Sequence, residues 1–418
     1  MTQNNLTSRL RKRDLLLFFS AGALPLPWMG VHFGVAPLPD SIWVAALAGM
    51  SILGGAFLLT WATELAERDI PQAAAILVLA LVSVLPEYAV DLHFAWTAGE
   101  DPSYAPFAVA NMTGANRLLI GIGWAAVVLV ACWRGGVDEL AIHHRQRREI
   151  RFLLWATLYS FAIPLTGTIN LMDAVVLFAL FGLYARSAMQ GESANLDLEG
   201  PSAIVSGRFD DVGRRLWVVG LFSFAAYGIF IAAEPFADSL VAIGRSGHFD
   251  EFLLVQWVAP LASESPEFLV ATFFAWKLRG SIGIGALISS KVNQWTLLVG
   301  AIPIAYALSS GALYGLPLDE RQSEELLLTS AQSLLATLLV VDLRFSRREA
   351  LLLAAAFLAQ FLITSTEGRY FFVVFYLVAA VGFYTFGPRS RRAAFNALLL
   401  PYRPEAEPLE SPPEAPVL

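Results

Sequence analysis

The sequence has little charge and almost no cysteine. Charged residues make up 15% of its 418 residues, well below the ~25% that is typical of a soluble domain. The single cysteine, Cys132, excludes an intrachain disulfide bond and a metal site made of several thiolates. The charges are sorted among the loops, and nothing in them suggests a nucleic-acid partner. These shortages argue against a soluble enzyme.

Apolar residues are abundant instead. They make up 56% of the chain, and long apolar runs recur from about residue 14 to residue 387. A membrane-spanning helix needs ~20 mostly apolar residues, and many of these runs are long enough. We therefore predict an all-α polytopic membrane protein with about twelve transmembrane helices. The predicted helices are 14–34, 40–64, 71–98, 104–133, 151–168, 170–188, 214–241, 251–277, 281–308, 323–342, 348–366 and 369–387.

Arginine and lysine alternate between frequent and rare along successive loops. They are frequent at the N-terminus and in the loops 134–151 and 189–213. The opposite loops hold only Arg245, Arg321 and Arg369. Because cytoplasmic loops carry the excess of positive charge in membrane proteins, we expect both termini in the cytoplasm and a bacterial plasma-membrane location.

One phrase occurs twice in the chain. It reads SVLPEYAVDLHFAW in residues 83–96 and SESPEFLVATFFAW in residues 263–276. Each copy belongs to a unit of five predicted helices, and two consecutive units with an odd number of spans enter the membrane from opposite sides. We therefore predict two inverted repeats, of the kind that holds a transport site near the membrane midplane. The predicted organisation is a cytoplasmic N-terminus with an extra helix (1–39), a first repeat (40–190), a cytoplasmic loop (191–213), a second repeat (214–366), an extra C-terminal helix (367–390) and a disordered cytoplasmic tail rich in proline and glutamate (391–418).

Each copy of the phrase places a Pro-Glu pair inside an apolar run. A proline within a helix cannot hydrogen-bond to the carbonyl four residues before it, so each proline should leave a free carbonyl oxygen. Ser83 and Glu87 share a helix face in the first copy, as do Ser263 and Glu267 in the second. Carboxylate, hydroxyl and carbonyl oxygens suit sodium, calcium or protons rather than softer metals.

Structural kinks alone explain this pattern less well. An acidic residue inside a membrane span costs ~2.5–3.5 kcal/mol on insertion scales, and a kink needs no acid. Here two symmetric glutamates are accompanied by a third, Glu264. We therefore predict a cation site that includes Glu87, Glu264 and Glu267.

The motifs around these residues resemble those of the sodium/calcium exchanger family in the cation/calcium antiporter superfamily. That family has two inverted five-helix halves, each with a Gly-Thr-Ser-Leu-Pro-Glu motif on one helix and a Gly-Asn-x-x-Gly-Ser-Asn motif on the next. The first motif corresponds here to VSVLPE (82–87) and ASESPE (262–267), and the second to ANMTGAN (110–116) and GALISSK (285–291). The resemblance covers about residues 40–366, with the alpha repeats at 71–133 and 251–308.

The resemblance implies cation exchange across the membrane by alternating access. It implies that Glu87 and Glu267 are the central metal ligands and that Ser83, Ser263 and Asn111 support them. No cofactor is implied beyond the transported cation, such as Ca²⁺, Na⁺ or H⁺. The implied partners are inorganic cations and the lipid bilayer, and the oligomeric state stays open.

The sequence also departs from the family pattern. Glu264 stands where a hydroxyl is expected, Ala286 where an amide or acid is expected, and Lys291 in place of an asparagine. Lys291 and Arg117 are therefore candidates for charge compensation and coupling, Lys291 as a tethered cation near the carboxylates. The alternative is that each forms a static pair between two helices. Asp91, one turn after Glu87, is expected near the lipid headgroups, and the alternative is a residue at the entrance of the site.

Other functions fit the same scaffold. A passive cation channel and a transport-inactive sensor remain alternatives to an antiporter. An intramembrane enzyme is not favoured, because the sequence shows no paired nucleophile and base and no two aspartates on facing helices.

Overall fold

The structure is a computed structural model that describes residues 3–66, 84–189, 200–247, 250–363 and 365–400. These residues are almost entirely helical, which confirms the all-α class. The helices up to residue 189 are α1 (Gln3–Ala23), α2 (Leu26–His32), α3 (Ser41–Ala66), α5 (Leu85–Glu100), η1 (Pro102–Tyr104), α6 (Ala105–Leu118), η2 (Leu119–Trp124), α7 (Ala125–Gly135), α8 (Gln146–Ser160), α9 (Ile163–Thr166) and α10 (Leu171–Ala188). The later ones are α11 (Pro201–Arg208), α12 (Asp211–Gly247), α13 (Glu251–Trp276), α14 (Gly280–Asn293), η3 (Gln294–Leu298), α15 (Val299–Ser310), α16 (Glu320–Val340), α17 (Arg347–Leu362), α18 (Thr366–Phe386) and α19 (Arg389–Leu399).

Several of these helices are long and apolar enough to cross a membrane. Six stretches of the described residues meet that criterion by length and composition: Lys12–His32, Ser41–Ala66, Pro102–Gly135, Leu171–Ala188, Asp211–Gly247 and Thr366–Phe386. Helices α13 and α16 are also long, but they carry acidic and amide side chains that are buried inside the bundle. The chain is therefore a polytopic membrane protein, and the number of twelve spans stays a prediction.

The two halves of the chain repeat the same local devices. A π-helical turn interrupts a long helix in each half, at η2 and at η3. Helix α10 begins with a capping box made by Asn170 and Asp173, and α17 begins with one made by Ser346 and Glu349. A capping box satisfies N–H groups that the first turn of a helix leaves without partners. The repeat in the sequence is thus also a repeat of helix starts and helix interruptions.

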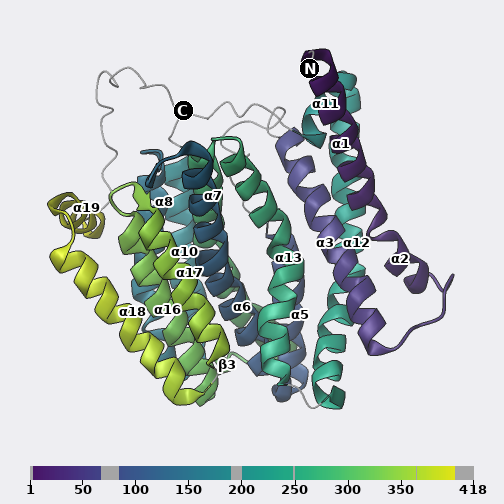
Figure 1. Cartoon of the computed structure of the whole chain (residues 1–418). Coiled ribbons are helices and arrows are strands. Elements are labelled where there is room, and N and C mark those ends of the chain that lie inside the picture. Colours follow the sequence, from purple (N-terminus) through teal and green to yellow (C-terminus); the bar gives the residue numbers. More distant parts are fainter. Residues whose placement is uncertain (1–2, 67–83, 190–199, 248–249, 364, 401–418) are drawn as a thin grey trace.

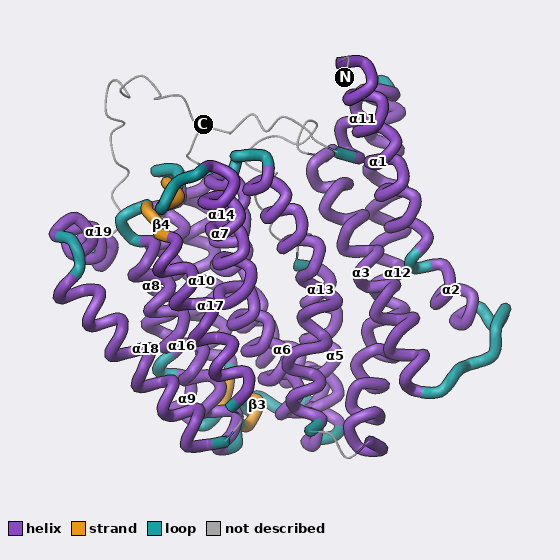
Figure 2. Tube along the Cα trace, viewed as in Figure 1, coloured by secondary structure: helices purple, strands orange, loops and turns teal. Residues whose placement is uncertain are grey.

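Two short antiparallel strand pairs join the halves. β1 (Glu139–Ala141) pairs with β4 (Arg344–Ser346), and β2 (Thr168–Ile169) pairs with β3 (Leu316–Pro317). Each pair takes one strand from either half, and Figure 2 shows β4 and β3 at opposite ends of the bundle. A rotation that places each half on the other would also place the pair β1–β4 on the pair β3–β2. This relationship is expected of an inverted repeat.

The helices form a layered bundle (Figure 1). Helices α1, α3 and α12 lie together on one side, α16, α17 and α18 lie on the other, and α5, α6 and α13 lie between them. Helix α13 packs against α3 and α12 on one side and against α6 on the other. The two helices that carry the Pro-Glu pairs, α5 and α13, are therefore central in the bundle.

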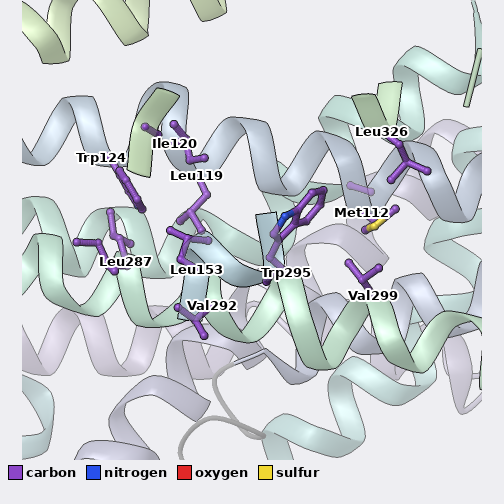
Figure 3. Close-up of a cluster of buried hydrophobic side chains, with 14 of the residues drawn as sticks. Met112, Leu119, Ile120, Trp124, Leu153, Leu287, Val292, Trp295, Val299 and Leu326 are labelled. Atoms are coloured by element: carbon purple, nitrogen blue, oxygen red, sulfur yellow. The ribbon is translucent and has the colours of Figure 1, made fainter. Parts of the chain in front are cut away.

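Large apolar side chains fill the region around the two π-helical turns. Trp124 of η2 and Trp295 of η3 are both buried, and Figure 3 shows Leu119, Leu287 and Val292 among the side chains around them. This packing belongs to one continuous hydrophobic core. A polar side chain among these helices must therefore find its partners inside the protein, because burial without partners is costly.

Several predicted segments differ from the structure in their helices. The first predicted helix, 14–34, is two helices, since α1 ends at Ala23 and α2 begins with Pro27 in its first turn, where proline is tolerated. The loop 191–213 contains α11. The predicted disordered tail begins too early, because α19 covers Arg389–Leu399.

Helix α19 is tied to the bundle at both of its ends. The Arg391 guanidinium lies 3.2 Å from Asp342 and 2.8 Å from Glu349. The Trp155 indole N–H donates a hydrogen bond of 3.0 Å to the Leu398 carbonyl. The segment rich in proline and glutamate therefore begins after residue 400, beyond this helix.

Candidate cation site

Helices α5 and α13 hold their Pro-Glu pairs differently. Helix α5 begins at Leu85, so Pro86 lies in its first turn, where a missing N–H costs little. Pro266 lies inside α13, which continues through it. The expected free carbonyl before Pro86 belongs to Val82, and Val82 and Ser83 lie outside the described residues. Glu87 consequently lies in the first turn of a helix.

Four acidic side chains gather where α5 meets α13. Glu87, Asp91 and Glu264 are at most 1% exposed, and Glu267 is half-buried. The charge of Glu87 acts on those of Asp91, Glu264 and Glu267. Glu267 also lies beside the Ser290 hydroxyl on α14. The structure therefore brings the two glutamates of the Pro-Glu pairs together with Glu264.

Two buried amides extend this carboxyl cluster, which we define as Glu87, Asp91, Glu264 and Glu267. Asn111 of α6 donates from Nδ2 to Asp91 Oδ1 at 2.8 Å. Gln294, the first residue of η3, donates from Nε2 to Glu264 Oε1 at 3.1 Å. Both amides are almost completely buried.

The expectation that Asp91 lies near the lipid headgroups is wrong. Its side chain is fully buried and bonded to Asn111. The spacing of four residues from Glu87 was the available signal, because residues one turn apart share a helix face. Neither Asp91 nor Gln294 was among the predicted site residues.

The serine of the second Pro-Glu phrase, Ser263, turns back into its own helix. Ser263 is buried, and its hydroxyl donates to the carbonyls of Ala259 and Pro260 at 3.4 Å each. These are weak geometries for a hydrogen bond. The oxygen of Ser263 keeps its capacity to accept or to bind a cation.

Lys291 of α14 is completely buried, and its side chain reaches Asn116 of α6. Its ammonium donates to Asn116 Oδ1 at 2.6 Å and to the Asn116 carbonyl at 3.4 Å. It also lies 4.3 Å from the centre of the Trp295 ring, a favourable position for a cation. The charge of Glu264 acts on it, but no carboxylate of the described residues forms an ion pair with it within 4 Å. The ammonium is therefore near the carboxyl cluster without being neutralised by direct contact.

Arg117 belongs to a different cluster. Its guanidinium forms an ion pair with Glu325 of α16 and lies 5.1 Å from the centre of the Trp257 ring. Glu325 also accepts a hydrogen bond from Gln256 of α13 at 3.0 Å. Arg369 of α18 pairs with the adjacent Glu324 at 2.6 Å. These contacts fit the static alternative for Arg117, because two arginines face two glutamates and no charge is left over.

The carboxyl cluster has no such balance. Several buried oxygen atoms of the cluster and of its two amides have no hydrogen-bond partner in the described chain: Glu87 Oε1 and Oε2, Asp91 Oδ2, Asn111 Oδ1, Glu264 Oε2 and Gln294 Oε1. All of them are acceptors. No group of three or more His, Cys, Asp or Glu side chains among the described residues has the arrangement of a ready-made metal site. A cation here would thus depend on mixed carboxylate and amide ligands, which suit hard cations.

Fold and cluster together define a membrane protein whose centre is built around buried carboxyl groups at the meeting of two inverted repeats. The family model described as "Sodium/calcium exchanger protein" matches residues 41–189 and 217–366. The chain belongs to this family, as the motifs predicted.

A solved structure with high similarity is described as the "Crystal Structure of H+/Ca2+ Exchanger CAX". It is 41% identical in sequence, with a TM-score of 0.87, over 93% of this chain and 98% of that one. YfkE is 14% identical with a TM-score of 0.59, over 87% of this chain and 99% of that one. The sodium-calcium exchanger NCX_Mj, soaked with 2.5 mM Na⁺ and 0.1 mM Ca²⁺, is 18% identical with a TM-score of 0.51, over 77% and 97%. The last two show the shared fold alone. No curated protein sequence matches the chain.

Proposed function

We propose that this chain is a secondary antiporter that exchanges Ca²⁺ for protons by alternating access at the carboxyl cluster. The cluster is the observation that carries the proposal. Four carboxyl groups meet one ammonium, that of Lys291, inside an apolar bundle. An excess of buried negative charge is costly, so protons or cations must neutralise it.

Protons and cations can both meet that requirement, and they compete for the same oxygens. A cation bound by Glu87 and Glu267 removes the need for protons there, and protonation of these groups removes the cation. Exchange then follows without a separate proton path. The similarity to the H⁺/Ca²⁺ exchanger supports protons and calcium as the pair. Sodium stays the alternative counter-ion, as in the exchanger NCX_Mj.

Lys291 has a coupling role in this proposal. Its ammonium acts on Glu264 and is held by Asn116. It therefore offsets one negative charge of the cluster when neither a cation nor a proton is bound there. Arg117 has no such role, since its charge is already paired with Glu325.

The direct test is counterflux with purified protein in liposomes. Ca²⁺ uptake is measured with a pH gradient (acidic inside), with an outward Na⁺ gradient, and with neither. Uptake that requires the pH gradient supports the proposal. Uptake that requires only the Na⁺ gradient replaces protons by sodium, equal uptake without any gradient indicates a channel, and no uptake under any condition contradicts an antiporter.

A further inference from the structure

Asp91 is a buried acid that belongs to one half of the protein only. It lies on α5, one turn after Glu87, and its side chain is fully buried. Its counterpart in the repeated phrase is Ala271, which packs closely against Gly283 of α14. In the second half, the contact between α13 and α14 therefore forms with an alanine at this position. Since a carboxyl group at this depth is costly, packing does not explain Asp91.

The contacts of Asp91 leave coordinating atoms free. Its Oδ1 accepts the hydrogen bond of Asn111, whereas its Oδ2 and the Asn111 Oδ1 have no hydrogen-bond partner in the described chain. Glu87 is 1% exposed, and both of its carboxyl oxygens also have no partner there. The charges of Glu87 and Asp91 act on each other. Three adjacent side chains from α5 and α6 therefore present acceptor oxygens, and Asn111 directs its one bonded donor to Asp91.

A purely structural role for Asp91, in which it only holds Asn111 in place, explains fewer of these contacts. A neutral residue such as asparagine could hold Asn111 equally well through one accepting oxygen. Anchoring also leaves the second carboxyl oxygen of Asp91 and both oxygens of Glu87 without partners. A cation bound among them would satisfy all of these atoms.

We propose that Glu87, Asp91 and Asn111 form a cation subsite on the first repeat, with Asp91 as a direct ligand that favours divalent over monovalent cations. This inference rests on the proposed antiport function. Two carboxylates and an amide oxygen are hard ligands, and their two negative charges match one divalent ion.

The second repeat cannot form the same subsite. The residues equivalent to Asp91 and Asn111 are Ala271 and Ala286, because Asn111 and Ala286 precede the π-helical turns η2 and η3 by the same interval. The second repeat instead contributes Glu264, Glu267 and Lys291. The transported cation therefore lies toward α5 and α6, away from the Lys291 ammonium.

The test compares binding of two ions to Asp91→Asn. This substitution keeps the size of the side chain and an oxygen that can accept from Asn111. Equilibrium binding of radioactive Ca²⁺ and Na⁺ is measured on purified protein in lipid nanodiscs. Ca²⁺ affinity should fall at least about tenfold, since even indirect partners of a metal site contribute that much, and Na⁺ affinity should fall much less.

The control is Asp101→Asn. Asp101 is an exposed carboxylate just after α5, and its replacement should change neither affinity. An unchanged Ca²⁺ affinity in Asp91→Asn overturns the inference. Equal loss for both ions also overturns it, because Asp91 would then only position Asn111.

A charge swap covers the case in which the single variant does not fold. The double variant Asp91→Asn/Asn111→Asp restores one negative charge to the same pair. It should bind Ca²⁺ in preference to Na⁺, and loss of that preference counts against the inference. The results also separate this inference from the proposed function. If the wild type exchanges cations and Asp91→Asn keeps the wild-type ion preference, only the subsite is overturned. If the wild type binds neither ion, both the subsite and the proposed function are overturned.

Discussion

Lys291 and Asn116 occupy equivalent places in the two halves and are hydrogen-bonded to each other. Each lies three residues before the π-helical turn of its half, and the Lys291 ammonium is 2.6 Å from Asn116 Oδ1. Residues that an approximate twofold axis exchanges can touch only close to that axis. The one ammonium of the site therefore lies where the repeats meet, next to the carboxyl cluster rather than inside it.

Replacing Lys291 by methionine should strengthen cation binding. The substitution keeps most of the volume and removes a positive charge that opposes an incoming cation. We expect the Ca²⁺ concentration for half-maximal uptake to fall severalfold, a change of about 1 kcal/mol at the binding step. Uptake by proteoliposomes at a series of Ca²⁺ concentrations measures this effect. Lys277→Met, at the exposed end of α13, is the matched control. An unchanged or weaker affinity would assign Lys291 to a purely structural role.

The Arg117–Glu325 pair should affect stability and not ion affinity. Arg117→Met leaves Glu325 with a buried charge, which among the described residues still contacts Gln256 and, at a longer distance, Arg369. Removal of one partner from a buried pair typically costs about 3–5 kcal/mol, so the melting temperature in detergent should fall clearly. The double variant Arg117→Met/Glu325→Leu should lose less than the two single variants together.

The exposed pair Arg344–Glu139 serves as the control for this experiment. Its two side chains are 66% and 50% exposed, and exposed pairs contribute about 0–1 kcal/mol. Arg344→Met should therefore barely change the melting temperature. A large change in Ca²⁺ affinity for folded Arg117→Met would instead connect Arg117 to the cation site.

Gly114 should tolerate no side chain. A Cβ atom at this position would collide with the backbone carbonyl of Gln256, so α6 and α13 could not keep their contact. Overpacking of this kind costs typically about 1–3 kcal/mol, and it would also displace Asn111 and Asn116 on α6. Gly114→Ala should lower both the melting temperature and the transport rate. Gly182→Ala on α10, where nothing lies within 4 Å, should change neither; equal behaviour of the two variants would contradict the close crossing.

The features that the sequence predicted are the ones that repeat. The doubled Pro-Glu phrase identified the halves, and in the structure the halves also share the capping boxes at Asn170 and Ser346. Periodic apolar runs are sufficient for such predictions, because they reflect local helix formation. Helix α19 was not predicted, because the arginines in its sequence are typical of a polar tail. Its place in the fold depends on Asp342 and Glu349, which pair with Arg391.

The parts of the site that were missed depend on contacts between distant segments. Asp91 is buried because α6 brings Asn111 to it, and Arg117 is neutral in effect because α16 brings Glu325 to it. Acidic residues near the predicted start of a span, such as Glu325, look solvated in the sequence alone. The packing of the helices decides whether such a charge is paired within the protein or is available to a cation. This packing cannot be predicted from a local sequence pattern.

The central claim is that Glu87 and Glu267 bind the transported cation. Glu87→Gln and Glu267→Gln keep the side-chain size and remove a carboxylate, and loss of a buried charge should leave the protein folded. The decisive measurement is Ca²⁺ uptake driven by a pH gradient in proteoliposomes, with Glu100→Gln at the exposed end of α5 as the control. We predict that both variants fall to the rate of protein-free liposomes while the control keeps the wild-type rate. Exchange at the wild-type rate by both glutamine variants would contradict the account and leave the Pro-Glu pairs as structural features.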